Sequence, residues 1–117
     1  MIIKKSQTEA IDFDGLHILD YTAGKNWGSS MALIHVPPGA KHRRAYSRRS
    51  DKYYLVIDGC LKFDLDGREY WLEAGDFALV PQGSQFQYEN VGDQPARLIL
   101  VHTPAFILEE EVFVEVT

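Results

Sequence analysis

Cationic and phenolic side chains are concentrated in one short stretch of this 117-residue chain. Six of the 12 Lys and Arg residues lie between Lys41 and Lys52, and Tyr46 and Tyr54 lie within or beside the same stretch. An arginine fork matches a carboxylate or phosphate, a buried lysine can act as a base or form a Schiff base, and a phenol can donate a proton. These residue types predict either a site for a small anionic molecule or a segment that pairs with acidic groups elsewhere.

The rest of the chain is acidic, which limits the partners to be expected. The formal net charge is −5, and the residues outside 41–52 carry 6 basic and 16 acidic side chains. Such a body does not attract polyanions in general, so we expect no nucleic-acid partner. No apolar run approaches the roughly 20 residues of a membrane-spanning helix, and residues 1–6 resemble no signal peptide. With Cys60 as the single cysteine, we expect a cytoplasmic protein without a membrane partner.

Short apolar segments alternate with turn signals along most of the chain. Asp-Gly pairs, which favour tight hairpins, occur at 14–15, 58–59 and 66–67. Strands are predicted at 16–21, 31–36, 52–57, 61–65, 69–72, 77–80, 85–88 and 97–102. No segment between them has a convincing helical period. The pattern therefore predicts an all-β sandwich or barrel in one domain.

Two segments of the sequence resemble the two motifs of the cupin family. Residues 39–59 begin and end with a glycine at the family's spacing, and residues 75–90 contain a glycine, a Pro-x-Gly and a closing asparagine. The resemblance covers roughly residues 30–103. It implies a cupin-type double-stranded β-helix, or jelly-roll barrel, with residues 1–117 as a single cupin domain. Beyond residue 103, apolar and acidic side chains alternate at strand period along the tail, with Glu111 and Phe113 in one set, so residues 104–117 are expected to form a C-terminal strand or arm. Many cupins are dimers, so a homodimer is expected.

The resemblance also locates the usual metal ligands, and these positions hold unsuitable residues. The family's Glu position is Lys52 and the His of the second motif is Phe86. The His-x-His pair falls on Tyr46 and Arg48, or one register earlier on Ala45 and Ser47. Lys and Arg are cations and Phe has no lone pair, so no metal and no other cofactor is expected. As the alternative, a divalent transition metal would be held by His42 and His102, with Asp51 or Glu89.

The resemblance implies that Lys52, at the family's Glu position, faces into the barrel, and strand alternation from Lys52 then predicts the rest of the lining. The predicted ligand-binding residues are Tyr46, Arg48, Lys52, Tyr54, Phe86, Tyr88 and His102, with His35 as a further addition. One or two cations, several phenols and an aromatic wall suit a small anionic or aromatic molecule, such as a keto acid or sugar phosphate. In the contrasting interpretation, the aromatic residues simply fill a small barrel and the basic residues pair with acids.

Three functions follow from these interpretations. The first is a metal-independent cupin that binds a small anionic metabolite and isomerises, epimerises or cyclises it. The second is a metal-dependent cupin enzyme, of dioxygenase, lyase or isomerase type, with a non-standard ligand set that includes His42. The third is a non-catalytic binding or sensory module. The sequence leaves open whether the protein is an enzyme and assigns no catalytic residue.

Overall fold

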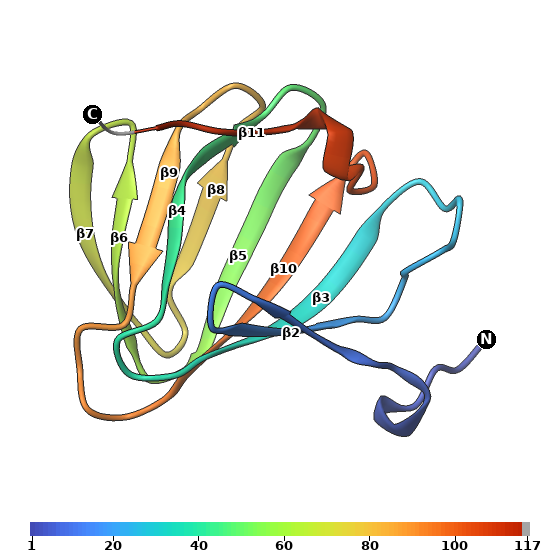
Figure 1. Cartoon of the computed structure of the whole chain (residues 1–117), viewed down its shortest axis with the longest axis horizontal. Coiled ribbons are helices and arrows are strands. Elements are labelled where there is room, and N and C mark those ends of the chain that lie inside the picture. Colours follow the sequence, from blue (N-terminus) through green and yellow to red (C-terminus); the bar gives the residue numbers. More distant parts are fainter. Residues whose placement is uncertain (116–117) are drawn as a thin grey trace.

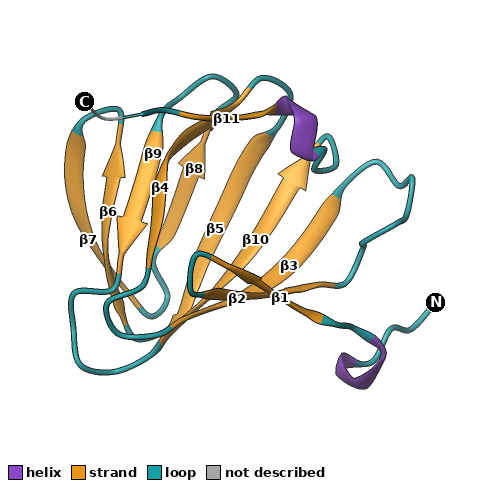
Figure 2. Ribbon diagram, viewed as in Figure 1, coloured by secondary structure: helices purple, strands orange, loops and turns teal. Residues whose placement is uncertain are grey.

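Two antiparallel sheets pack face to face in the computed structural model, which describes residues 1–115 (Figure 1). The six-stranded sheet has the order β1 (Ala10–Phe13), β2 (Leu16–Asp20), β3 (Ser30–Val36), β10 (Ala96–Thr103), β5 (Asp51–Asp58) and β8 (Phe77–Val80). The five-stranded sheet has the order β11 (Glu111–Phe113), β4 (Lys41–Ser47), β9 (Phe86–Glu89), β6 (Cys60–Leu65) and β7 (Arg68–Glu73). Two short 3-10 helices, η1 (Lys5–Gln7) and η2 (Leu108–Glu110), complete the described part (Figure 2).

The all-β jelly-roll fold predicted from the sequence is confirmed. All eight predicted strands are present, each within one residue at either end. The jelly roll is open, since within residues 1–115 no strand of one sheet is paired with a strand of the other. The sequence pattern does not predict β1 and β4, because neither has regular apolar alternation. Of the expected C-terminal arm, β11 is a strand, and residues 116–117 lie outside the described residues.

Two of the three Asp-Gly pairs form tight hairpins, whereas Asp58-Gly59 joins β5 to β6 in the other sheet. Asp14 and Gly15 join β1 to β2 with φ values of 53° and 89°, and Asp66 and Gly67 join β6 to β7 with 52° and 88°. Two consecutive residues in the left-handed region give the turn whose twist matches that of the flanking strands. These turns fix the register of both hairpins, and with it the side chains that face the interior.

An aromatic cluster fills one half of the space between the sheets. Tyr54 from β5 packs against Phe63, Phe86 and Tyr88 of the facing sheet, with ring centroids 5.5 to 5.8 Å apart. All four rings are fully buried. Tyr54, Phe86 and Tyr88 therefore face the interior as predicted. In this half of the molecule they act as a packed core.

A β-bulge in β4 changes which residues of the basic segment face inward. β4 pairs with β9 through His42 opposite Tyr88 and Ala45 opposite Phe86, so β4 has one extra residue between these pairs. His42 and Ala45 consequently share the inner face although they are three positions apart.

The bulge corrects the register expected for the first motif. Ala45 and Ser47 are buried, which is the earlier of the two registers considered. Tyr46 faces away from the interior, and Arg48 lies on the surface 3.5 Å from Glu110. The prediction that Tyr46 and Arg48 line the barrel is therefore wrong in orientation.

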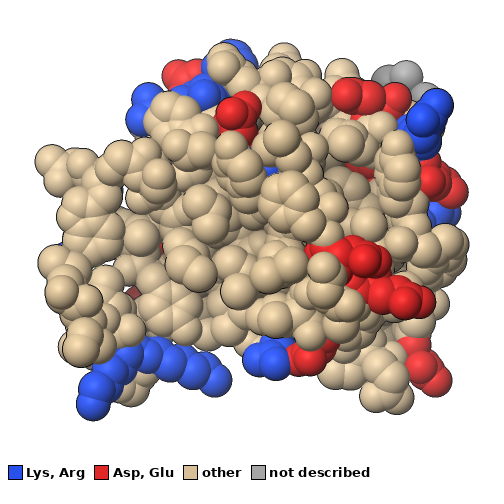
Figure 3. Space-filling model, turned by 180° about the vertical axis from the view of Figure 1, so that it is seen from behind, with Lys and Arg blue, Asp and Glu red and all other residues tan. Residues whose placement is uncertain are grey.

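The outer surface of the six-stranded sheet carries exposed apolar side chains. They come from β3, β5 and β8 and comprise Met31, Leu55, Phe77 and Leu79. Figure 3 views the molecule from behind and shows a broad surface with few charged side chains. Among the described residues, no helix has the length and apolar character needed to cross a membrane. The expected homodimer remains a prediction.

Replacing Gly59 with alanine should destabilise the fold more than the same change at Gly67. Both glycines have positive φ, but a Cβ at Gly59 would lie 2.7 Å from the Pro95 carbonyl oxygen, whereas a Cβ at Gly67 meets nothing within 4 Å. We expect Gly67→Ala to lower the free energy of unfolding by about 1 kcal/mol and Gly59→Ala by about 3 kcal/mol. Urea unfolding of both variants measures this, and equal losses would contradict the role assigned to close packing at Gly59.

Candidate functional site

A cavity of about 260 Å³ occupies the half of the interior that the aromatic cluster leaves open. It lies between the six-stranded sheet and the C-terminal segment that carries η2 and β11. Apolar side chains of β1, β2, β3 and β10 form most of its wall. The ionisable or phenolic side chains that line it are Asp20, His42, Lys52, Tyr54, His102 and Glu111. An apolar cavity with a few convergent polar groups is typical of a small-molecule site.

Lys52 is a buried cation held by two partners. Its side chain is 3% exposed, and its Nζ lies 2.9 Å from His102 Nε2 and forms an ion pair with Glu111 Oε1. Lys52 and His102 meet because they are direct cross-strand partners on β5 and β10. Burial lowers the pKa of Lys52, and the Glu111 carboxylate partly offsets this effect. The Glu111 carboxylate in contact with Nζ favours the ammonium form of the lysine.

The contact with Lys52 fixes the tautomer of His102. An ammonium can only donate, so His102 Nε2 accepts a hydrogen bond and the ring proton lies on Nδ1. Burial, and then the Lys52 charge, lowers the pKa of His102 to about 3. His102 is therefore a neutral imidazole at neutral pH and serves as a hydrogen-bond acceptor for the lysine.

Glu111 reaches the interior from the C-terminal segment. β11 adds to the edge of β4, with Glu111 opposite Ser47 and Phe113 opposite Ala45, so both side chains face inward. Within residues 1–115, two buried side-chain oxygens have no hydrogen-bond partner, Glu111 Oε2 and the Tyr88 hydroxyl. Buried polar atoms are normally paired, so these two oxygens suggest a place for ligand groups or water.

His42 lies at the junction between the cavity and the aromatic cluster. Its ring is 4.8 Å from Phe86 and 5.4 Å from Tyr88, measured between centroids. Its Nδ1 lies 2.7 Å from the Arg43 carbonyl oxygen, which can only accept, so Nδ1 carries the proton and Nε2 has a free lone pair. Burial lowers the pKa of His42 to about 4. His42 is thus a neutral imidazole with one nitrogen available to take a proton.

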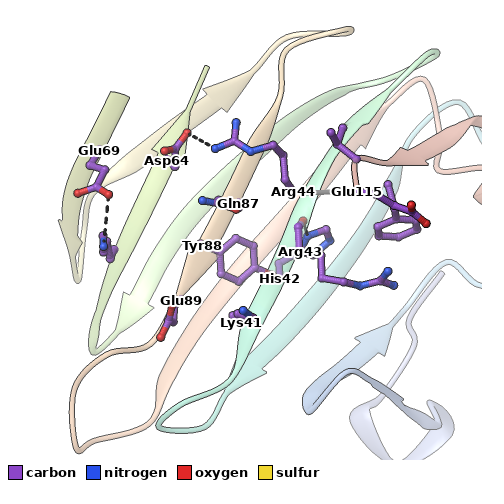
Figure 4. Close-up of a pocket in the computed structure, with 13 residues that line it drawn as sticks. Lys41, His42, Arg43, Arg44, Asp64, Glu69, Gln87, Tyr88, Glu89 and Glu115 are labelled. Atoms are coloured by element: carbon purple, nitrogen blue, oxygen red, sulfur yellow. Dashed lines mark hydrogen bonds and ion pairs between the residues drawn. The ribbon is translucent and has the colours of Figure 1, made fainter. Parts of the chain in front are cut away.

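A second hollow, of about 480 Å³, lies where β4, β9, β6 and β7 present their outer side chains (Figure 4). Arg44 lies 3.4 Å from Asp64, and Lys62 lies 3.3 Å from Glu69. Much of its charge is therefore paired within the protein, as in the alternative interpretation of the basic segment. His42 lines both this second hollow and the cavity, and Figure 4 shows its ring beside Tyr88.

The structure brings together some of the predicted site residues and separates others. Lys52, Tyr54 and His102 line the cavity, and Phe86 and Tyr88 pack beside it. Tyr46 and Arg48 lie outside, and His35 is directed away from the interior on β3. Sequence reasoning missed Glu111 entirely and considered His42 only as a metal ligand. The signal for Glu111 was the alternation of the acidic tail, in which Phe113 shares its face.

The residues in the cavity do not fit the metal site of the resembled family. The Lys52 ammonium already occupies the space between His102 Nε2 and the Glu111 carboxylate, and Ala45, Ser47 and Phe86 supply no imidazole or carboxylate. Among residues 1–115, no three His, Cys, Asp or Glu side chains converge. Of the alternative ligands, His42 and His102 both line the cavity, but Asp51 and Glu89 do not. Asp51 accepts a hydrogen bond from the Gln82 backbone, and Glu89 lines the second hollow.

The sequence matches a family model and curated relatives. The family model described as "Cupin domain" matches residues 32–102. The Tetracenomycin polyketide synthase protein TcmJ of Streptomyces glaucescens is 34% identical over 71 residues, which cover 61% of this chain and 48% of that protein. The polyketide synthase CurC of Streptomyces cyaneus is 31% identical over 74 residues, covering 63% and 48%. The chain thus spans about half the length of these curated relatives.

Solved structures share the whole fold at low sequence identity. The structure of Pac13, described as a unique nucleoside dehydratase, superimposes with a TM-score of 0.84 at 20% identity, covering 98% of this chain and 91% of that one. Further structures contain Streptomyces Pac13 variants with uridine. A sugar phosphate isomerase from Silicibacter pomeroyi has a TM-score of 0.76 at 25% identity, covering 88% and 75%.

The depressed pKa of His42 predicts a loss of stability on acidification. Below the ordinary value of 6.5 the unfolded chain binds a proton, whereas folded His42 does so only near 4. Stability should therefore fall as the pH drops from about 6.5 to about 4, at roughly 1.4 kcal/mol per pH unit for this group.

His42→Gln should make this fall shallower, with His102 responsible for part of what remains. Urea unfolding of the native protein and the variant at several pH values measures the two slopes. His17→Gln, at an exposed position on β2, is the control and should leave the slope unchanged. Identical slopes for the native protein and His42→Gln would show that His42 does not resist protonation in the folded state.

Proposed function

Because this chain belongs to the cupin family, we propose that its cavity binds a small organic molecule and that its own side chains move a proton on that molecule. The observation that carries the proposal is His42, a neutral imidazole at the cavity wall whose Nδ1 is committed to a carbonyl and whose Nε2 is available. A low pKa leaves this nitrogen unprotonated at neutral pH, as a base requires. The positive charge in the cavity is the Lys52 ammonium, which pairs with the Glu111 carboxylate. The proposed proton transfer therefore uses only groups of the protein and no metal.

The reaction class we propose is elimination of water from a hydroxylated carbonyl compound. His42 Nε2 takes a proton from the carbon beside the carbonyl group, and the hydroxyl group on the next carbon leaves with a proton returned by the imidazolium. The products are an unsaturated carbonyl compound and water. Tyr54 and Tyr88 are suited to hydrogen-bond the substrate as donors, because burial raises the pKa of both phenols and keeps them protonated.

The structural neighbours support this reaction class. Pac13 is described as a nucleoside dehydratase, and its structures with uridine include one histidine-to-glutamine and two tyrosine-to-phenylalanine variants. The present chain likewise has one histidine and two tyrosines together: His42 and Tyr54 line the cavity, and the ring of Tyr88 packs against both. The apolar and aromatic walls favour a substrate that contains a ring.

The relatives from polyketide synthases suggest a second candidate substrate for the same proton transfer. Polyketides are rich in carbonyl and hydroxyl groups, and loss of water from them creates aromatic rings. CurC and TcmJ each exceed 30% identity to this chain over their matched residues. Under this proposal His42 would again act as the base. The substrate would be longer, and only one end of it would lie in the cavity.

His42→Gln should abolish most of the proton transfer. We expect exchange of carbon-bound protons with deuterated water, and formation of the unsaturated product, to fall at least about 100-fold. The assay follows nuclear magnetic resonance spectra of diacetone alcohol, a neutral β-hydroxy ketone, incubated with the protein in deuterated water. The activity of the native protein should decline only as the pH approaches about 4, where His42 gains a proton.

His17→Gln, the exposed-histidine variant, should retain native activity. Binding of a compound without exchange by the native protein would instead favour a non-catalytic binding module. Full activity in His42→Gln would exclude His42 as the base.

A further inference from the structure

Lys52 occupies the position that holds a metal-binding glutamate in the cupin motif. Its side chain is itself a cation. Its Nζ is contacted by the imidazole nitrogen of His102 at 2.9 Å and by a carboxylate oxygen of Glu111. Imidazole and carboxylate are the groups that hold divalent metals in proteins. We propose that the Lys52 ammonium takes the role of a resident cation and binds the carbonyl oxygen of a neutral hydroxylated aldehyde or ketone. This inference rests on the proposed function and names its substrate class.

The ammonium has one donor left for such an oxygen. Of its three N–H groups, one is directed to His102 and one to Glu111, and no further acceptor contacts Nζ within residues 1–115. The ring of Phe86 lies 5.3 Å away on one side, and the cavity adjoins Lys52 on another. A carbonyl oxygen in the cavity can accept the third N–H.

The charge balance of the site favours a neutral substrate. Glu111 is 7% exposed and already neutralises Lys52, while His42 and His102 are uncharged because burial lowers the pKa of each. A ligand carboxylate or phosphate would add a second anion beside Glu111. A neutral hydroxyl group would instead donate to Glu111 Oε2, which is buried and unpartnered among the described residues.

The same arrangement stabilises the charge that develops during elimination. When His42 removes the proton, the electron pair of the C–H bond moves onto the carbonyl oxygen, which becomes negative beside the Lys52 ammonium. The pair then returns to expel the hydroxyl group, which leaves as water with the proton from His42. Lys52 and Glu111 end the cycle unchanged. A fixed cation aimed at a developing oxyanion typically contributes about 100-fold to 1,000-fold in rate.

A Schiff base at Lys52 is the competing chemistry, and the contacts disfavour it. An amine must lose its proton before it can attack a carbonyl carbon, and Glu111 in direct contact retains that proton on Nζ. The two roles are distinguishable, because only a Schiff base is trapped by borohydride as a permanent adduct on the lysine.

The test compares the native protein with the double variant Lys52→Met/Glu111→Gln, which removes both charges and leaves no buried ion alone. With diacetone alcohol as the probe, we expect deuterium exchange to fall about 100-fold or more, while binding of the probe changes only a few-fold. The matched control is Lys62→Met/Glu69→Gln, which removes an exposed Lys–Glu pair and should retain native exchange. Native exchange in the Lys52 double variant would overturn the proposal, as would a borohydride-trapped adduct on Lys52.

An infrared measurement tests the contact between Lys52 and the carbonyl oxygen independently of the proton transfer by His42. The infrared carbonyl stretch of bound, isotopically labelled diacetone alcohol should shift to lower frequency in the native protein and in the control, and stay near its solution value in the double variant. If the native protein shifts this band but exchanges no proton, the proposed elimination fails and the ammonium site stands. If exchange occurs without a shifted band, the Lys52 assignment fails and the role of His42 stands.

Discussion

The buried charge of Lys52 constrains the arrangement of the whole cavity. An ammonium taken out of water needs a counter-ion and hydrogen-bond acceptors, or the fold bears a large desolvation cost. Here the neighbouring strand β10 supplies a neutral imidazole, and the counter-ion comes from β11 on the edge of the other sheet. The ion pair therefore joins the two sheets at the cavity wall. It ties the C-terminal segment to the interior, where Phe113 packs against Phe13 of β1.

The interior combines two states that the sequence presents as alternatives. Around Tyr54, Phe63, Phe86 and Tyr88 the sheets are packed solid, with rings in stacked and edge contacts. Beyond Lys52 the space stays open and mostly apolar. His42 lies at the boundary, so its imidazole has a rigid aromatic wall on one side and room for a ligand on the other. Such a boundary restricts the ring orientation and still permits access.

Local sequence patterns sufficed for most of the fold and for part of the site. Asp-Gly turns and period-two alternation located eight strands. The family resemblance implied that Lys52 faces inward, and strand alternation then placed Tyr54 on the same side. The failures have specific physical causes. A bulge inserts a residue into β4 and breaks the alternation that the register of Tyr46 and Arg48 assumed. The role of Glu111 depends on its contact with Lys52, which lies 59 residues away in the sequence. No local pattern predicts which acidic residue will pair with a buried lysine.

The bulge in β4 also bears on how this site can evolve. In a regular strand, loss of one residue turns every later side chain to the opposite face. At Arg43 and Arg44 a deletion of one residue would restore simple alternation and leave both His42 and Ala45 directed inward. The outer side of the strand would change, since Arg43 binds Asp14 and Arg44 binds Asp64. A one-residue deletion at this point can therefore change the exterior of the jelly roll while the residues that face the interior stay the same.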